Sequence, residues 1–217
     1  MLIFLGLPPT VANGTNRVAI LVQNVGAVWG FQRHRMIDWR WIPRAGLPAA
    51  LGAMVGAWLA IHMGDDAFRR ILAGVIIVAA AWTLWDPLKR WQRTPRPGPV
   101  PLGPGVMAAF FGIGIYGGFI QAGVGFLVLA VVTIVGLDFV RGNALKVLTA
   151  LLFTPLALLL FSLYGKVDWA SGGALALGNL LGSQVGVHLS VLKGHDWIRR
   201  VVMITVVIFA IRLWMAS

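Results

Sequence analysis

The chain has 217 residues, of which 59% are hydrophobic and 12% are charged, and its formal net charge is +11. A chain of this length cannot bury so much apolar surface in a water-soluble globule, so the composition predicts a polytopic membrane protein. The chain contains no cysteine, which excludes disulfides, thiolate metal sites and cysteine nucleophiles.

Apolar segments separated by polar or basic loops predict an all-α bundle of transmembrane helices. The segment DPLKRWQRTPRPGPVPLGP, which follows the third span, is rich in proline and basic residues, as is typical of an extended linker. The predicted spans are Val11–Phe31, Trp41–Met63, Phe68–Trp85, Val106–Phe119, Val124–Val135, Val140–Leu163, Ala170–Leu192 and Ile198–Met215.

The segment GIGIYGGFIQAGVGFL, Gly112–Leu127, carries six glycines inside an apolar stretch that runs from about Val106 to Val135. That stretch is too long for one ordinary crossing of about 20 residues and too rich in glycine for one smooth helix. We expect a helix that breaks near Gln121–Gly125 and continues as a second short helix from Val124. Broken helices mark substrate sites in transporters, and the alternative is that the glycines serve close helix packing.

The chain aligns with itself without a gap when it is shifted by 130 residues. A register kept over a whole half predicts an internal duplication, which is characteristic of secondary transporters that bind substrate where the repeats meet. The equivalent pairs include Asn13 and Asn143, Phe31 and Phe161, Asp38 and Asp168, Gly52 and Gly182, Gly56 and Gly186, and Arg69 and Arg199.

The duplication also predicts a missing element. The Gly-rich segment lies before Gly136, whereas the equivalent Gly6 is preceded only by residues 1–5. We therefore expect that about 30 residues, forming a first Gly-rich broken helix, are absent ahead of Met1.

The loop charges indicate how the two halves are oriented. Basic residues follow the first span of the first half, whereas in the second half they follow the second span. This reversal favours inverted repeats, with the Gly-rich segment crossing twice and the linker in the cytoplasm. A re-entrant hairpin and parallel repeats stay open. The predicted organisation is a first transmembrane repeat (1–86), a Pro/Arg-rich cytoplasmic linker (87–104) and a second transmembrane repeat (105–217).

Polar residues at the start of equivalent spans predict a site for a small anion. Asn13, Asn16 and Arg17 begin one span, and Asn143 and Lys146 begin the other. With the N-terminus of a half-helix at Gly123–Gly125, their amides and cations would surround an anion. The alternative is that the two cations snorkel to the interface while the asparagines cap helices.

Asn179 and Gln184 lie on the Ala170–Leu192 span and would add polar contacts from the second half. All seven acidic residues are Asp at predicted span ends or loops, so no carboxylate lies in a span to relay protons. The four histidines share no ligand spacing and no nucleophile elbow occurs, so we expect no metal, no cofactor and no enzyme activity. The basic residues flank spans instead of clustering, which disfavours nucleic acid as a partner.

The motifs LGLPPTVANGTNRVAILVQNVGAVWGF, GIYGGFIQAGVGFL and GNALKVL, in this order, resemble the sulfite exporter TauE/SafE family of bacterial inner-membrane permeases. The resemblance covers essentially the whole chain, apart from the family's first glycine motif. Gln121 stands where a glycine is more usual in that family. The resemblance implies transport of sulfite, sulfonates or related small anions.

These observations together predict a multi-pass secondary transporter of a small anion in the bacterial inner membrane, working by alternating access. Asn13 and Asn143 would donate to the oxyanion, and Arg17 and Lys146 would supply positive potential. The alternatives are a non-transporting membrane partner or assembly factor, and an anion channel. The expected partners are the small anion and the lipid bilayer, and the sequence is compatible with a homodimer. The predicted substrate-binding residues are Asn13, Asn16, Arg17, Gln121, Gly123, Gly125, Asn143, Lys146, Asn179 and Gln184.

Overall fold

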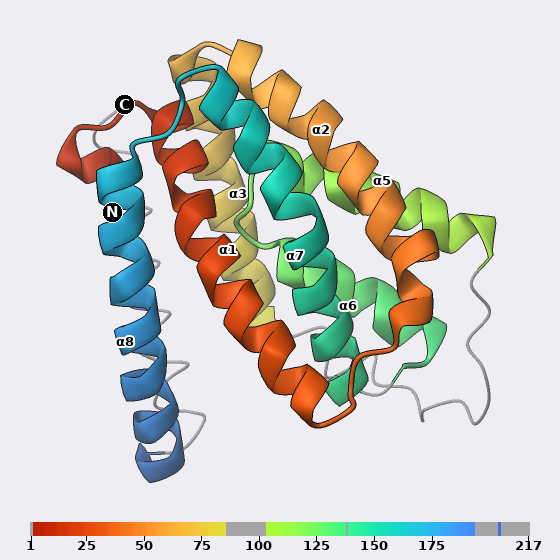
Figure 1. Cartoon of the computed structure of the whole chain (residues 1–217). Coiled ribbons are helices and arrows are strands. Elements are labelled where there is room, and N and C mark those ends of the chain that lie inside the picture. Colours follow the sequence, from red (N-terminus) through yellow and green to blue (C-terminus); the bar gives the residue numbers. More distant parts are fainter. Residues whose placement is uncertain (1, 86–102, 138, 194–203, 205–217) are drawn as a thin grey trace.

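The computed structural model of the chain describes residues 2–85, 103–137, 139–193 and 204, and this part is helical without any strand (Figure 1). Three short segments precede or join the helices: the 3-10 turns η1 (Leu2–Leu5) and η2 (Trp39–Trp41), and the π-helical turn η3 (Ile42–Gly46). The α-helices are α1 (Pro9–Arg33), α2 (Leu47–His62), α3 (Asp65–Trp85), α5 (Pro104–Phe119), α6 (Val124–Val135), α7 (Phe139–Leu163) and α8 (Trp169–Lys193).

The all-α prediction is confirmed, and a helix occupies each predicted span that the structure describes. The Ile198–Met215 span apart from Ile204, and the linker apart from its last two residues, lie outside the described residues. Within the described residues, two helical segments, Trp39–His62 and Val140–Leu163, are long and apolar enough to cross a membrane, and α5 and α6 are shorter apolar helices. The second predicted span, Trp41–Met63, corresponds to the segment Trp39–His62, whose first turns are not α-helical because η3 lies there. Pro48 has no N–H to donate to the carbonyl of Arg44, so the backbone widens locally into a π turn.

α1 and α7 pack against each other and run in opposite directions. Near the start of α1, Thr15 Oγ1 accepts a 2.9 Å hydrogen bond from the backbone N–H of Asp168, which follows the end of α7. The second helix of each half packs on the first helix of the other half, α2 on α7 and α8 on α1. Each half therefore completes the packing surface of the other.

Glycines bring α2 and α5 into backbone contact, and this pair forms the most extensive helix interface. A Cβ atom on Gly56 would lie 1.9 Å from the carbonyl oxygen of Ile115, and one on Gly114 would lie 2.1 Å from that of Ala49. No side chain fits at such distances, so the two helices depend on glycine to pack this closely. Close packing of the glycines, the alternative to a substrate site, is therefore one of their roles.

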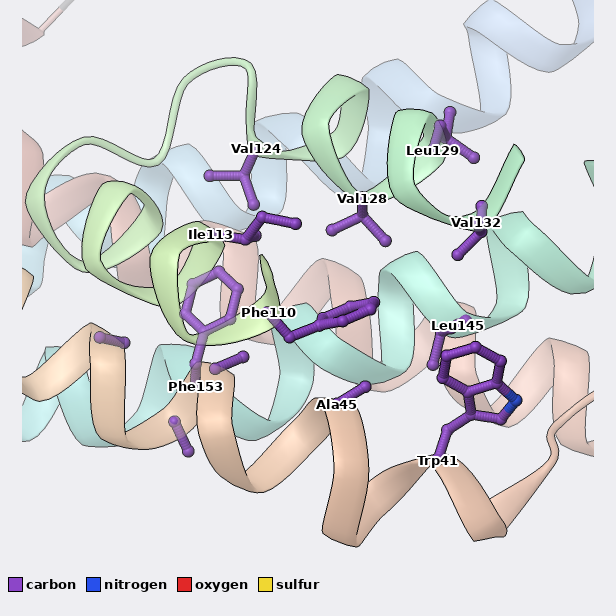
Figure 2. Packing of buried hydrophobic residues seen from close by; sticks show 13 residues of the cluster. Trp41, Ala45, Phe110, Ile113, Val124, Val128, Leu129, Val132, Leu145 and Phe153 are labelled. Atoms are coloured by element: carbon purple, nitrogen blue, oxygen red, sulfur yellow. The ribbon is translucent and has the colours of Figure 1, made fainter. Parts of the chain in front are cut away.

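The main core lies where α5, α6 and α7 cover the start of the α2 segment. Figure 2 shows the ring of Phe110 between Ala45 on one side and Val128 of α6 on the other. Trp41 lies at one end of this core, with its ring centroid 6.2 Å from that of Phe110. The core thereby fixes α5 and α6 against the longer helices that hold them.

Equivalent positions of the two halves share backbone conformation as well as sequence. α7 begins and ends 130 residues after α1. Gly6 and Gly136 both have left-handed φ angles, +92° and +93°, and so do Arg35 and Gly165, at +54° and +65°. Asp38 and Asp168 each accept a hydrogen bond from a backbone N–H at the start of the following helix.

The α2–α5 packing generates the first prediction. Gly114→Ala places a methyl group against the backbone of Ala49, so it should destabilise the protein by about 1–3 kcal/mol. Gly112→Ala, two residues away on α5, is the matched control, because nothing lies within 4 Å of its Cβ position. The readout is the thermal midpoint of the detergent-solubilised protein. Equal midpoints for both variants would contradict the packing described.

Candidate functional site

The Gly-rich segment forms a helical hairpin whose tip lies between α5 and α6. α5 ends at Phe119, Ile120 is extended, and α6 begins at Val124 after Gly123, whose φ is +80°. Only glycine adopts this left-handed conformation without strain. The hydroxyl of Tyr116 donates a 2.7 Å hydrogen bond to the carbonyl of Ala122 and so ties the tip to the last turns of α5. The break therefore lies where the glycines predict it.

The hairpin arms are short for a membrane. α5 has 16 residues and α6 has 12, which at about 1.5 Å per residue gives lengths of about 24 and 18 Å. Both fall short of the hydrocarbon thickness of about 30 Å. These lengths favour a re-entrant hairpin over two full crossings. Irregular backbone at membrane depth requires protein or water around it, and the surroundings of the tip provide protein.

Arg17 of α1 reaches the tip of the hairpin. Its Nη1 donates to the carbonyl of Gly117 at 3.1 Å and to Oε1 of Gln121 at 2.9 Å, and its Nη2 donates to the carbonyl of Gly118. The side chain is completely buried. The last carbonyls of a helix have no intrahelical donor, and α1 supplies donors for those of α5.

Two further side chains complete this arrangement. The Nδ2 of Asn13 donates to the carbonyl of Phe119 at 2.9 Å, and the Nε2 of Gln121 donates to Oγ1 of Thr154 on α7 at 3.1 Å. We call Asn13, Arg17, Gln121 and Thr154 the tip clamp. It links α1, the hairpin and α7 through hydrogen bonds in a buried region.

The charge of Arg17 is balanced by dipoles. The guanidinium faces the C-terminal end of α5, which is the negative end of the helix dipole. It also lies 4.8 Å from the centroid of the Phe161 ring, an attractive arrangement for a cation. Among the described residues, Arg40–Asp38 is the one ion pair, so no carboxylate there neutralises Arg17. The Nε of Arg17 has no hydrogen-bond partner in this part of the chain.

A second polar group lies at the start of α6. The Nζ of Lys146 donates to Oδ1 of Asn143 at 2.9 Å, and its Cδ lies 3.1 Å from the Cβ position of Gly125. Both side chains, like Gly123 and Gly125, are half-buried. The first N–H groups of a helix have no acceptor within it. We call Gly123, Gly125, Asn143 and Lys146 the α6 entrance, where a cation and the positive end of a helix dipole meet.

The structure thus divides the predicted site residues into two groups. Three of the predicted residues meet in the tip clamp: Asn13, Arg17 and Gln121. Four others lie together at the α6 entrance: Gly123, Gly125, Asn143 and Lys146. Asn16 is half-buried on α1 and belongs to neither group. Asn179 is on α8, which packs on α1 at the edge of the bundle (Figure 1), and the side chain of Gln184 lies outside the described residues.

Sequence reasoning missed Thr154 and the carbonyls of α5 as members of the site. Thr154 had one visible signal, since it is a polar residue in an apolar span, one residue before Pro155. Backbone carbonyls carry no sequence signal. In the described part of the chain, no group of His, Asp or Glu side chains is arranged to hold a metal ion.

Comparison with known proteins identifies the family. The profile of the family described as "Sulfite exporter TauE/SafE" matches residues 1–213. The chain belongs to the sulfite exporter TauE/SafE family. The resemblance of the glycine and ANGTNR motifs is thereby confirmed, and the protein is a transmembrane permease.

Curated relatives of this TauE/SafE protein are named as transporters. "Probable membrane transporter protein YfcA" of Escherichia coli (strain K12) is 29% identical over 213 residues, which are 96% of this chain and 77% of that protein. "Probable membrane transporter protein" of Haemophilus influenzae is 27% identical over 205 residues, 94% of this chain and 79% of that protein. "Probable membrane transporter protein ORF9" of Sinorhizobium sp is 29% identical over 214 residues, with 96% and 79% covered. No solved structure matches the chain.

The tip clamp generates the second prediction. Arg17→Met removes the donors to Gly117, Gly118 and Gln121, and hydrogen bonds to a charged group contribute about 1.5–3 kcal/mol each. We expect the thermal midpoint of the detergent-solubilised permease to fall by well over 5 °C. Arg17→Lys should recover only part of this loss, because an ammonium cannot reproduce the planar fork of donors.

Arg33→Met is the matched control for this experiment. Arg33 is exposed at the other end of α1, where its guanidinium lies over the ring of Trp29. This substitution should change the midpoint little. If Arg17→Met and Arg33→Met had the same midpoint, the clamp would not hold the hairpin.

Proposed function

We propose that this permease is a secondary transporter of a small oxyanion such as sulfite or a sulfonate. The observation that carries the proposal is the α6 entrance, where the half-buried ammonium of Lys146 lies beside the N-terminus of α6. We assign substrate binding to this group. Asn13 and Arg17, by contrast, have their hydrogen bonds directed to the hairpin. They would position the binding group rather than contact the anion.

The chemistry of the α6 entrance suits a small oxyanion. Free backbone N–H groups and the positive dipole end at Val124 and Gly125 attract negative charge. The ammonium of Lys146 donates to Oδ1 of Asn143, so a cation and an amide lie together in this region. The glycines leave the backbone accessible, as the approach of the Lys146 side chain to Gly125 shows. Sulfite and sulfonates carry several oxygens that can each accept one of these bonds.

Three features support inverted repeats as the framework of alternating access. The equivalent helices α1 and α7 run in opposite directions, each half packs its second helix on the other's first helix, and equivalent turns share left-handed residues. In such transporters the two repeats rock about a site at their interface. The tip clamp spans that interface, since it joins α1 of one half to α5 and α7 of the other.

The arginine-rich loop between α1 and α2 assigns an orientation to the protein. Positively charged loops face the cytoplasm, so we place this loop and the start of α7 on the cytoplasmic side of the bacterial inner membrane.

The third prediction concerns transport. Purified protein in liposomes should exchange labelled sulfite or a labelled sulfonate against unlabelled substrate inside. Asn143→Leu and Lys146→Gln should each reduce the initial rate at least tenfold, because they remove donors of the α6 entrance. Asn24→Leu is the matched control, because the side chain of Asn24 donates to the carbonyl of Ile20 within α1, away from the entrance.

The same measurement separates the alternatives. A channel would conduct the anion without accumulation of label driven by exchange. A non-transporting partner would give no flux with any oxyanion, and that result would overturn the proposal. Full exchange activity in Asn143→Leu and Lys146→Gln would disprove the assignment of the α6 entrance.

A further inference from the structure

A cavity of about 700 Å³ lies at the opposite end of α7 from the α1 N-terminus, between the α1–α2 turn and the start of α7. We call it the arginine pocket. The tip clamp and the α6 entrance do not contribute to its walls. Its lining residues are Arg35, Met36, Ile37, Asp38, Trp39, Arg40, Trp41, Arg44, Leu137, Arg141, Ala144, Leu145 and Leu148.

The pocket is strongly positive. Four guanidinium groups line it, against one carboxylate. That carboxylate, Asp38, pairs with Arg40 through two 3.0 Å contacts. The hydrogen bonds from Arg40 hold the pKa of Asp38 below its usual range, so Asp38 is ionised at neutral pH. Arg35 and Arg44 have no carboxylate partner among the residues that the structure describes. The excess of positive charge is therefore available to an anion.

The backbone at Arg35 shows that the fold accepts strain to place an arginine here. Arg35 lies in the turn after α1 in a left-handed conformation, and the N–H of Met36 donates to the carbonyl of Phe31. This turn normally carries glycine. The equivalent turn after α7 does so, with Gly165 in the corresponding place. Residues held in strained backbone conformations cluster at functional sites.

The walls of the pocket combine charge with apolar surface. Trp39 is half exposed and Trp41 is buried, and both lie at the start of the Trp39–His62 span, where tryptophans anchor helices at the interface. The floor is apolar and consists of buried side chains of α7: Ala144, Leu145 and Leu148. A ligand that suits these walls has an anionic head and an apolar part.

We propose that the arginine pocket binds the phosphate group of an anionic phospholipid from the adjacent leaflet. Basic pockets between transmembrane segments recognise such headgroups through charge-assisted hydrogen bonds to phosphate oxygens. Soluble phosphate offers the same recognition chemistry without the apolar part. The proposal is independent of transport, since the pocket shares no residue with the α6 entrance.

The test uses the whole protein solubilised in detergent micelles doped with phosphatidylglycerol or with phosphatidylcholine. Native mass spectrometry measures the retained lipid, and a titration with inorganic phosphate measures competition. Wild-type protein should retain phosphatidylglycerol at least fivefold over phosphatidylcholine. Millimolar phosphate should leave this retention unchanged if the lipid is the ligand. Displacement of the lipid by phosphate at that concentration would identify a soluble phosphate as the ligand and overturn the lipid assignment.

Two variants separate binding from folding. Arg35→Gly should lose at least half of the selectivity while its thermal midpoint stays equal or rises, because glycine relieves the left-handed strain. The double variant Arg44→Gln with Arg141→Gln should abolish the selectivity. Arg33→Gln is the control, because Arg33 is an exposed arginine near the same end of α1 but outside the pocket. Undiminished selectivity in Arg35→Gly and in the double variant would overturn the proposal.

Discussion

The arrangement of the described bundle depends on one interaction, the capping of α5 by Arg17. A helix that ends inside a bilayer leaves carbonyls without donors, and each such group is costly where no water can reach it. Arg17 supplies three hydrogen bonds to the hairpin, two of them to α5 carbonyls, and Asn13 supplies another. The guanidinium is buried, and the dipoles of the α5 carbonyls that it caps stabilise its charge. Neither partner would be stable at this depth without the other.

Glycine residues determine how closely α2 and Lys146 approach the hairpin formed by α5 and α6. On α2 and α5 the glycines let the backbones touch, which fixes the hairpin laterally. At Gly123 and Gly125 they serve a different purpose, since one permits the left-handed turn and the other leaves room for Lys146. The same residue type therefore packs the hairpin and exposes the start of α6. Packing and binding are complementary in this segment.

The positions of the spans, and of the break before Val124, could be predicted because hydrophobicity and glycine content are local properties. The η3 turn escaped prediction because it depends on how Pro48 affects the hydrogen bonds of the preceding turn. The partners of Arg17 escaped because they are carbonyls 100 and 101 residues away in sequence. The arginine pocket escaped for a similar reason, since Arg141 joins the loop around Arg35 only through the packing of the two halves. The sequence therefore indicated which polar side chains of the two halves meet, whereas the individual contacts between the halves could not be predicted.

The sequence distance between Arg17 and its acceptors has a consequence for biogenesis. α1 emerges from the ribosome long before α5, so its guanidinium enters the bilayer before any of its acceptors has been synthesised. An arginine near the centre of a helix raises the insertion free energy by about 2.5–3.5 kcal/mol. In the nascent first half this cost is not offset by the hydrogen bonds to the hairpin, because the hairpin has not yet been synthesised. Completion of the hairpin then supplies the acceptors, so the stability of α1 in the membrane depends on synthesis of the second half.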